Sequence, residues 1–267
     1  MTHPATGGNG GGASCEVWWA RTAYCRPGLA ALLTRSETVR RDLYARADDR
    51  DRFTVSAALV RLAAARQLGL GARDIGVVRD CPDCPLPHGR PRIEGARLDV
   101  SVSYAGSVVV VAVSHGARVG VDVETVGLLT SRHAAVLQRA LGADELSTLE
   151  KTPEDARATW LLRRWTYKEA VVKATGDGLR VPLPGIQLCE TSAMTRLASY
   201  PGRPELLDGR TVLMPVDAPP GFTDPESMAS AAFLMDRGMS IHRVRSRDAW
   251  ELFDSERSSE LVDRVQG

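Results

Sequence analysis

Long hydrophobic runs, lysine and a secretory leader are scarce or missing in this sequence. No run of about 18 apolar residues occurs, so we expect no membrane-spanning helix. Residues 1–14 are rich in glycine and lack the basic and apolar regions of an export signal, which predicts a disordered tail. The five cysteines are an odd number and do not suit a disulfide framework. These absences predict a cytoplasmic protein with free thiols.

Lysine is rare: of 34 basic residues only three are lysine, namely Lys151, Lys168 and Lys173. The last two lie five positions apart in one segment. An ammonium group can release a proton, whereas a guanidinium effectively cannot. The placement therefore suggests that this segment needs an ammonium group, with chance clustering as the alternative.

The net charge of +1 conceals an uneven distribution along the chain. Residues 21–97 hold fifteen arginines against nine acidic residues, whereas residues 118–267 hold nineteen basic and twenty-two acidic residues. A basic half beside a mildly acidic half suits a phosphorylated ligand that lies between them. Uneven surface charge without a function is the alternative.

Strand and helix patterns follow a similar order in the two halves of the chain. The first half predicts a strand, two helices, a short strand and a hairpin, at residues 17–20, 28–46, 50–68, 75–78, 98–104 and 107–113. The second half predicts a strand, three helices and a final antiparallel sheet, at residues 119–124, 131–141, 143–150, 153–175, 186–191, 196–200, 211–216, 228–235 and 239–244. Thr152 is expected to cap the third of these helices, and Gly176 to end it.

This order predicts an α+β fold, built as a pseudo-twofold pair of similar subdomains. The expected units are residues 15–116 and 117–267, each an antiparallel sheet packed with helices. The first would face a nucleotide, and the second would carry the carboxylates described next.

Two carboxylates share one face of the strand predicted at 119–124. Asp122 and Glu124 lie two positions apart, so their side chains project on the same side, roughly 7 Å apart at the backbone. Val119, Val121 and Val123 point the other way, into the core, and Gly120 permits a close approach to the backbone. Such a pair can hold a hard cation such as Mg²⁺. A solvated strand face is the alternative.

The helix predicted at 153–175 adds a third carboxylate and the ammonium group. Trp165, Glu169 and Lys173 follow each other at four-residue intervals and lie on one helix face. An ordinary surface ion pair is the alternative. If Glu169 joins Asp122 and Glu124 around one Mg²⁺, the site suits transfer of a phosphoryl-type group from a diphosphate to a hydroxyl. Lys173 would then assist the leaving group, and a carboxylate would accept the hydroxyl proton.

A proline-rich loop contains Cys81-x-x-Cys84-x-x-x-His88. The spacing supplies three zinc ligands, but no fourth is evident nearby. We interpret the segment as a shaped loop that delivers His88 and Arg90 towards nucleotide phosphates. Whether the three residues bind zinc stays open.

Two segments resemble the signature motifs of the 4′-phosphopantetheinyl transferase superfamily. They are Val119-Gly-Val-Asp-Val-Glu124 and Trp165-Thr-Tyr-Lys-Glu-Ala-Val-Val-Lys173, in the family's order and about 45 residues apart. Weaker resemblances lie at Ser101-Val-Ser-Tyr104-Ala-Gly106, Gly89-Arg90-Pro91 and Asp51-Arg52. The resemblance extends over residues 15–245 and points to the larger, surfactin-synthetase-type group, whose members are monomeric pseudodimers.

The resemblance implies a reaction in which coenzyme A, as co-substrate, gives its phosphopantetheine arm to a carrier-protein serine and releases adenosine 3′,5′-bisphosphate. Asp122, Glu124 and Glu169 would hold Mg²⁺ or Mn²⁺. Glu169 would also assist deprotonation of the serine, and Lys173 departure of the leaving group. The residues implied at the coenzyme A site are Arg52, His88, Arg90, Ser103, Tyr104, Lys168 and Lys173.

The chain departs from the family pattern at two positions. Tyr104 stands where the family often has histidine, so a hydrogen-bond donor remains but a cationic contact is lost. Arg90 stands where lysine is usual, which suits phosphate binding and adds a bidentate contact. Neither change touches the three carboxylates, so we expect an active enzyme.

The partners implied by the resemblance are acidic acyl or peptidyl carrier proteins that bind transiently, by analogy at residues 127–150. No nucleic acid or membrane partner is expected, and a polyketide or nonribosomal peptide pathway is the expected setting. One alternative is a Mg²⁺-dependent hydrolase that acts on nucleotide diphosphates. Another is an inactive relative that binds carrier proteins, which the intact Asp122, Glu124, Glu169 and Lys173 argue against.

Overall fold

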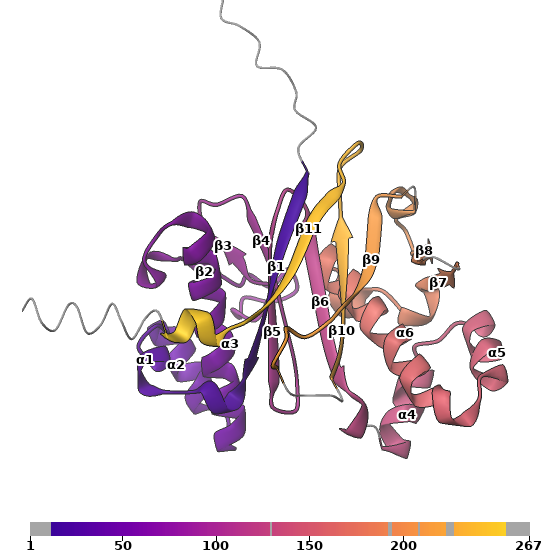
Figure 1. Ribbon diagram of the computed structural model, residues 1–267, viewed down its shortest axis with the longest axis horizontal. Helices are drawn as coiled ribbons and strands as arrows, with labels where there is room; N and C mark the ends of the chain where they lie inside the picture. The colour runs from indigo at the N-terminus through magenta and orange to yellow at the C-terminus, as the bar shows by residue number, and fades with distance from the viewer. Residues whose placement is uncertain (1–11, 129, 192–193, 208, 223–226, 255–267) are drawn as a thin grey trace, which may run out of the picture.

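The computed structural model describes residues 12–254 except 129, 192–193, 208 and 223–226. Helices cover the two outer sides of the molecule, and the long strands lie between them (Figure 1). Among the described residues, no helix has both the length and the apolar character needed to cross a membrane. Most of the predicted tail lies outside the described residues, and the first strand begins at Ala13, inside the range predicted as tail.

The first half contains five strands and three α-helices: β1 (Ala13–Arg21), α1 (Pro27–Ala30), α2 (Arg35–Asp42), α3 (Ala47–Leu68), β2 (Val77–Val78), β3 (Arg92–Ile93), β4 (Leu98–Ala105) and β5 (Val108–His115). The single helix predicted at 28–46 is wrong, because α1 ends at Ala30 and α2 starts anew. Thr34 caps α2 and forms a capping box with Glu37, which fixes the break.

The described residues of the second half form three α-helices and six strands: β6 (Arg118–Thr125), α4 (Ser131–Gln138), α5 (Ala143–Lys151), α6 (Glu154–Thr175), β7 (Gln187–Glu190), β8 (Thr195–Ser199), β9 (Thr211–Val216), β10 (Ser227–Leu234) and β11 (Ile241–Asp248). Gly176 ends α6 with a φ of 74°, as predicted. The predicted Thr152 cap is wrong. Pro153 occupies the cap position, and the Thr152 hydroxyl donates instead to the Thr148 carbonyl oxygen at 2.9 Å.

Three sheets form. One has the order β11-β1-β5-β4-β3-β2, the second has the order β6-β10-β9, and β7 pairs with β8. The predicted place of the last strand in the final antiparallel sheet is wrong, because β11 pairs in parallel with β1. This pairing satisfies the backbone groups on the outer edge of β1. Ala249, Leu252 and Phe253 then join the core of the first half, so the predicted unit 117–267 does not hold for this segment.

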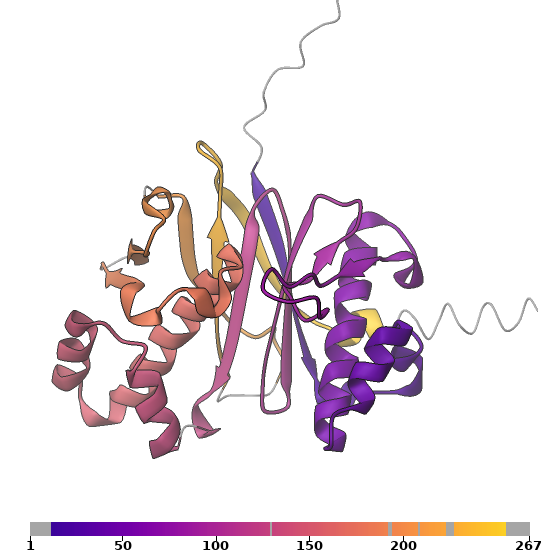
Figure 2. The same cartoon turned by 180° about the vertical axis from the view of Figure 1, so that it is seen from behind.

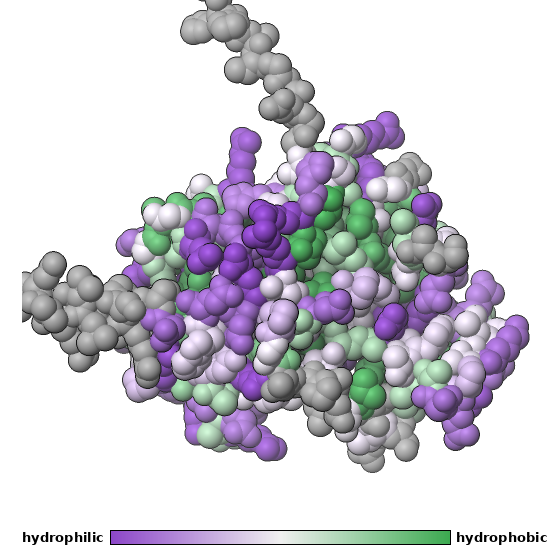
Figure 3. All heavy atoms as spheres, in the orientation of Figure 1, coloured by the Kyte–Doolittle hydropathy of each residue, from purple (hydrophilic) through white to green (hydrophobic). Residues whose placement is uncertain are grey.

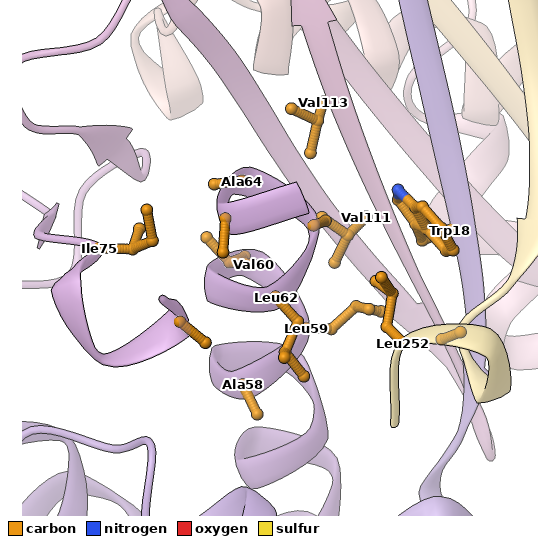
Figure 4. Packing of buried hydrophobic residues seen from close by; sticks show 14 of the residues in the cluster. Trp18, Ala58, Leu59, Val60, Leu62, Ala64, Ile75, Val111, Val113 and Leu252 are labelled. Atoms are coloured by element: carbon orange, nitrogen blue, oxygen red, sulfur yellow. The ribbon is translucent and has the colours of Figure 1, made fainter. Parts of the chain in front are cut away.

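Within the described residues, three large apolar layers separate the elements, and a smaller cluster lies between α4, α5 and α6. Trp18, Leu59, Val111 and Leu252 belong to the layer between α3 and the six-stranded sheet (Figure 4). A second layer fills the space between the two larger sheets, and a third lies between α6 and β9-β10. Strand β5 is apolar almost throughout because it faces the first layer on one side and the second on the other. The prediction of a strand buried on both faces is confirmed.

The second layer is only partly covered on the side that Figure 3 presents. Hydrophilic side chains gather over much of the first half there, and hydrophobic ones are visible near β9 and β10. Val212, Met214, Ile241 and Val244 are the partly buried members of this layer that come from β9 and β11.

The polar face of β4 joins the two larger sheets. Three β4 side-chain oxygens accept backbone N–H groups of β6 at a constant offset of twenty residues: Asp99 from Val119 at 2.7 Å, Ser101 from Val121 at 3.0 Å and Ser103 from Val123 at 3.3 Å. The alternation of β4 was predicted, but not this junction. The junction sets Ser103 beside β6, the strand that carries Asp122 and Glu124.

Helix α6 lies directly against β6 because Gly120 has no side chain. A Cβ atom at Gly120 would lie 1.9 Å from the Ala170 carbonyl oxygen and 2.5 Å from the Ala174 nitrogen. The predicted close approach to Gly120 is therefore made by the α6 backbone. This packing brings the face of α6 that carries Glu169 and Lys173 to Asp122.

The α+β class is confirmed: antiparallel pairing dominates the sheets, and helices pack against them. The two halves also share an order along the chain: a long strand, three helices, two short strands and two further strands. In each half the last strand of this order pairs with the first and with the strand before it, which gives the orders β1-β5-β4 and β6-β10-β9. A pseudo-twofold relation between the halves stays a prediction.

Candidate functional site

A cavity of about 850 Å³ lies between the two halves. Its walls come from α2 and α3, the loop before β3, β4, α4, α6 and the segment that follows α6. Figure 2 shows the loop that precedes β3 reaching from the first half towards the second. A volume of this order suits a ligand of cofactor size.

The cavity wall is strongly cationic. Its six arginines and one lysine are Arg40, Arg52, Arg79, Arg90, Arg139, Arg180 and Lys173. The carboxylates on the same wall are Asp49, Asp83 and Glu169. Of the six arginines, sequence analysis singled out only Arg52 and Arg90. The arginine excess of residues 21–97 pointed to the region but not to Arg40 or Arg79, and nothing in the sequence marked Arg139 and Arg180.

Arg79 is the cavity arginine that most clearly lacks an anion. Its Nε is buried without a hydrogen-bond partner, and burial lowers the pKa of its guanidinium. The neighbouring acid, Glu37, is already paired with the buried Arg61 at 2.8 Å. A buried guanidinium with an unused N–H is suited to donate to a phosphate oxygen in the cavity.

Asp122 is the centre of a polar cluster beside the cavity. It is 4% exposed, and its Oδ1 accepts from Lys173 Nζ at 2.6 Å and from Ser103 Oγ at 2.8 Å. Lys173 Nζ also donates to Ser103 Oγ at 2.8 Å. The second oxygen, Oδ2, is buried and has no partner. Asp122 therefore has an unused ligand atom.

Two further carboxylates crowd this cluster. Burial, with the Asp122 charge as the next cause, raises the pKa of Glu124 to about 7, although Trp165 Nε1 donates to its Oε1 at 3.1 Å. Burial and Asp122 likewise raise the pKa of Glu169, while Lys173 opposes the shift. Burial and closely spaced negative charge make ionisation costly here, and a bound cation would reverse that cost.

The chemistry of the cluster fits a hard divalent cation. It offers carboxylate oxygens from Asp122, Glu124 and Glu169, including the unpartnered Oδ2, and no sulfur. The oxygens of the three carboxylates do not all lie within 4.8 Å of one another. Among the described residues, the only set of three potential ligand atoms that meets this distance belongs to the cysteine–histidine loop. Joint binding of one Mg²⁺ by the three acids therefore stays a prediction.

Five of the residues predicted at the coenzyme A site line the cavity: Arg52, His88, Arg90, Tyr104 and Lys173. Arg90 donates to both Asp99 oxygens and to the Val119 carbonyl oxygen, so it also braces the β4–β6 junction. Arg52 pairs with Asp49 and lies over the Tyr104 ring at 4.8 Å. Tyr104 is 54% exposed and free to turn towards a ligand.

Ser103 and Lys168 do not line the cavity. Ser103 is buried in the Asp122 cluster instead. The prediction for Lys168 is wrong: its side chain is fully buried and donates to Glu145 at 2.5 Å and to the Ala140 carbonyl oxygen at 2.7 Å. Lys168 therefore ties α6 to α5, the helix that carries Glu145.

Both signature segments, with all three carboxylates and Lys173, fall within residues 118–211. These same residues match the family model of the 4′-phosphopantetheinyl transferase superfamily. This part of the chain therefore carries the sequence pattern of that superfamily. The resemblance predicted from the two motifs is thereby confirmed, whereas the surfactin-synthetase-type group stays a prediction.

Relatives of the 4′-phosphopantetheinyl transferase superfamily match a wider stretch. A Synechocystis protein provisionally named a 4′-phosphopantetheinyl transferase is 29% identical over 161 residues, which are 57% of this chain and 61% of that one. The 4′-phosphopantetheinyl transferase HetI of Nostoc is 27% identical, over 57% and 62%. The Bacillus subtilis 4′-phosphopantetheinyl transferase is 27% identical, over 51% and 57%. The chain thus spans about three fifths of the length of the curated relatives it matches.

Metal-free protein is expected to lose stability as the pH rises from about 5 to about 7, because Glu124 lies in a crowded carboxylate cluster. The pKa of Glu124 is about 7 in the folded protein, above its ordinary value of 4.5. Between these values the folded protein keeps a proton that the unfolded chain has released, so rising pH favours unfolding. Urea unfolding in the presence of EDTA, repeated across this range, measures the effect.

Glu124→Gln should flatten this pH dependence, whereas Glu154→Gln, an exposed change on α6, should leave it as in the wild type. Equal pH dependence in wild type and Glu124→Gln would contradict the described crowding of Glu124.

Proposed function

We propose that the protein transfers the 4′-phosphopantetheine arm of coenzyme A to a serine of an apo acyl or peptidyl carrier protein. The observation that carries the proposal is the position of Glu169 and Lys173. Both line a cationic cavity, and Lys173 contacts the buried Asp122 within a segment of the transferase superfamily. The superfamily match supports the reaction class, and the cavity supports a ligand with several phosphates.

Coenzyme A carries a diphosphate and a 3′-phosphate, which the cavity arginines suit in number and charge. Arg79 offers a buried N–H without a partner, and Arg40 and Arg139 lie on the same wall. Arginine binds phosphate oxygens through paired N–H groups. The aromatic ring of Tyr104, with Arg52 over it, adds a surface for the adenosine end.

In the proposed step, the serine hydroxyl oxygen attacks the phosphorus that bears the pantetheine arm. A new serine–phosphate ester bond forms, and the bond from that phosphorus to the bridging oxygen of the diphosphate breaks. The hydroxyl proton passes to the Glu169 carboxylate. Adenosine 3′,5′-bisphosphate leaves, and Lys173 neutralises the charge that develops on its departing oxygen.

We assign Asp122, Glu124 and Glu169 as the residues that would hold Mg²⁺ or Mn²⁺. When bound, the cation supplies positive charge to the diphosphate and to the departing oxygen. The orphaned Asp122 Oδ2 and the raised pKa values of Glu124 and Glu169 support this assignment. Trp165 holds Glu124 in place by its indole N–H.

The carrier protein would dock on α4 and α5, within the predicted range 127–150. Each helix presents a hydrophobic side chain to solvent, Val136 at 51% exposure and Leu146 at 38%. Arg139 lies beside them at the cavity wall and suits an acidic partner. The buried Lys168–Glu145 pair holds this surface against α6, close to the reacting groups.

We also propose that the chain is a monomeric pseudodimer of the larger, surfactin-synthetase-type group. The recurrence of β1-β5-β4 as β6-β10-β9 supports an internal repeat. The 22-residue helices α3 and α6, each ended by a glycine with positive φ, support it too. In such an arrangement one chain provides both walls of the cavity.

The appearance of adenosine 3′,5′-bisphosphate tests the proposal against the hydrolase alternative. The protein is incubated with coenzyme A and Mg²⁺, with and without an apo carrier protein, and the nucleotide is quantified by chromatography. We expect release only when the carrier is present, at one nucleotide per carrier molecule. Release without a carrier would favour the hydrolase, and no release with several carrier types would favour the inactive relative.

A further inference from the structure

Three potential metal ligands meet in the loop between β2 and β3. One ligand atom from each of Cys81, Cys84 and His88 lies within 4.8 Å of the other two. Cys84 Sγ and His88 Nε2 are 2.9 Å apart. In tetrahedral zinc sites, neighbouring ligand atoms are separated by roughly 3.5–4 Å, so small side-chain rotations would suffice. All five cysteines of the chain are free thiols, so no disulfide uses Cys81 or Cys84.

The backbone that follows Cys81 contacts its sulfur. The Asp83 N–H donates to Cys81 Sγ at 3.4 Å. This contact joins the first cysteine to the residue before the second and so fixes the turn between the two potential ligands. Two thiolates and an imidazole are soft and borderline ligands that suit Zn²⁺ and do not suit Mg²⁺ or Ca²⁺.

One hydrogen bond closes the loop at its base, and one ion pair connects it to the second half of the chain. The Gly89 N–H donates to the Arg79 carbonyl oxygen at 2.9 Å, which joins the two ends of the segment that holds the three ligands. A Cβ atom at Gly89 would lie 1.9 Å from the Asp80 carbonyl oxygen, so only glycine permits this closure. Arg180 pairs with Asp83 at 2.8 Å and connects the loop to the second half.

We propose that Cys81, Cys84 and His88 bind one Zn²⁺, which fixes this loop against the wall of the cavity. A solvent molecule or a ligand atom from the cavity completes the four-coordinate shell, because Cys81 and His88 both line the cavity. Arg79 and Arg90 flank the loop and both line the cavity, so the metal would hold two arginines of the cavity wall in place. The zinc site stands independently of the transfer reaction, and it gives His88 a role as a metal ligand.

Zinc content tests the proposal directly. Untagged full-length protein is purified under reducing conditions, mixed with one equivalent of Zn²⁺, passed through a desalting column and analysed by mass spectrometry for zinc. We expect about one zinc per chain, and at least a tenfold weaker affinity in Cys84→Ser and His88→Asn. Cys189→Ser removes an exposed cysteine outside the loop and should bind zinc as the wild type does.

Cobalt substitution identifies the metal ligands in the wild-type protein. The result therefore does not depend on whether the variants fold. Co²⁺ bound to the wild type should give the charge-transfer absorption of thiolate ligands and the visible bands of tetrahedral cobalt. Wild-type protein that retains less than about a tenth of an equivalent of zinc overturns the proposal. So do a cobalt spectrum without thiolate absorption, and a loss of zinc in Cys189→Ser equal to that in Cys84→Ser.

Hydrogen exchange tests the positioning role separately. Zinc should slow the exchange of backbone amides in residues 79–91, including the Gly89 amide that closes the loop. Residues 143–151 of α5 lie away from the loop and should exchange at the same rate with and without zinc. Zinc binding with no slowing in residues 79–91 would refute the proposal that the metal fixes the loop.

Discussion

Glu169→Gln is expected to lower the rate of phosphopantetheine transfer by about 10²–10⁴-fold while the fold stays intact. The substitution keeps the size of the side chain but removes the proposed proton acceptor and one proposed metal carboxylate. Burial and Asp122 raise the pKa of Glu169, so the ionised carboxylate is costly in metal-free protein. Metal-free Glu169→Gln should therefore be at least as stable as the wild type. Single-turnover transfer to an apo carrier protein and urea unfolding measure the two effects.

Glu154→Gln is the matched control, because it makes the same chemical change on α6 at an exposed position away from the cavity. It should transfer at the wild-type rate. Near-normal turnover by Glu169→Gln would refute the proposed metal and base assignment. A Glu169→Gln variant that unfolds more readily than the wild type would contradict the described charge crowding.

Gly120→Ala is expected to destabilise the protein by at least ~3 kcal/mol, at the upper end of what overpacking in a core costs. The added methyl group would lie 1.9 Å from the Ala170 carbonyl oxygen and 2.5 Å from the Ala174 nitrogen. Both are backbone atoms of α6, so the helix itself must move away from β6. That movement would also separate Lys173 from Asp122, so transfer activity should fall together with stability. Urea unfolding gives the free-energy change.

Gly202→Ala distinguishes this clash from the general cost of replacing a glycine. Gly202 has a φ of +73° and no atom within 4 Å of the added Cβ, so only backbone strain opposes the change. That strain costs about 1–2 kcal/mol. If Gly120→Ala destabilises no more than Gly202→Ala, the close packing of α6 on β6 is not as described.

Local sequence patterns predicted those site residues whose neighbours lie on the same strand or the same helix. Alternation along β6 identified Asp122 and Glu124 as neighbours on one face, and helical spacing placed Glu169 and Lys173 together. The fully apolar β5 was correctly predicted as a strand buried on both faces. In each case the burial of a single element, on one face or on both, determined the pattern.

Features that depend on contacts between distant segments could not be predicted in this way. The parallel pairing of β11 with β1 joins the two ends of the described chain, and nothing local to Ile241–Asp248 marks it. The family resemblance placed Lys168 in the ligand site, yet its partner Glu145 belongs to another helix. The cationic cavity likewise gathers arginines from both halves, so only their local excess was visible in the sequence.

The mass of an intact apo carrier protein tests the central claim most directly. The carrier is incubated with this protein, coenzyme A and Mg²⁺, and parallel samples contain EDTA or the Glu169→Gln variant. We predict that the carrier gains the mass of one phosphopantetheine group on a single serine, and that the gain is lost with EDTA and strongly reduced with Glu169→Gln. No mass gain on several acyl and peptidyl carriers, or a gain that persists without a divalent cation, would contradict the account.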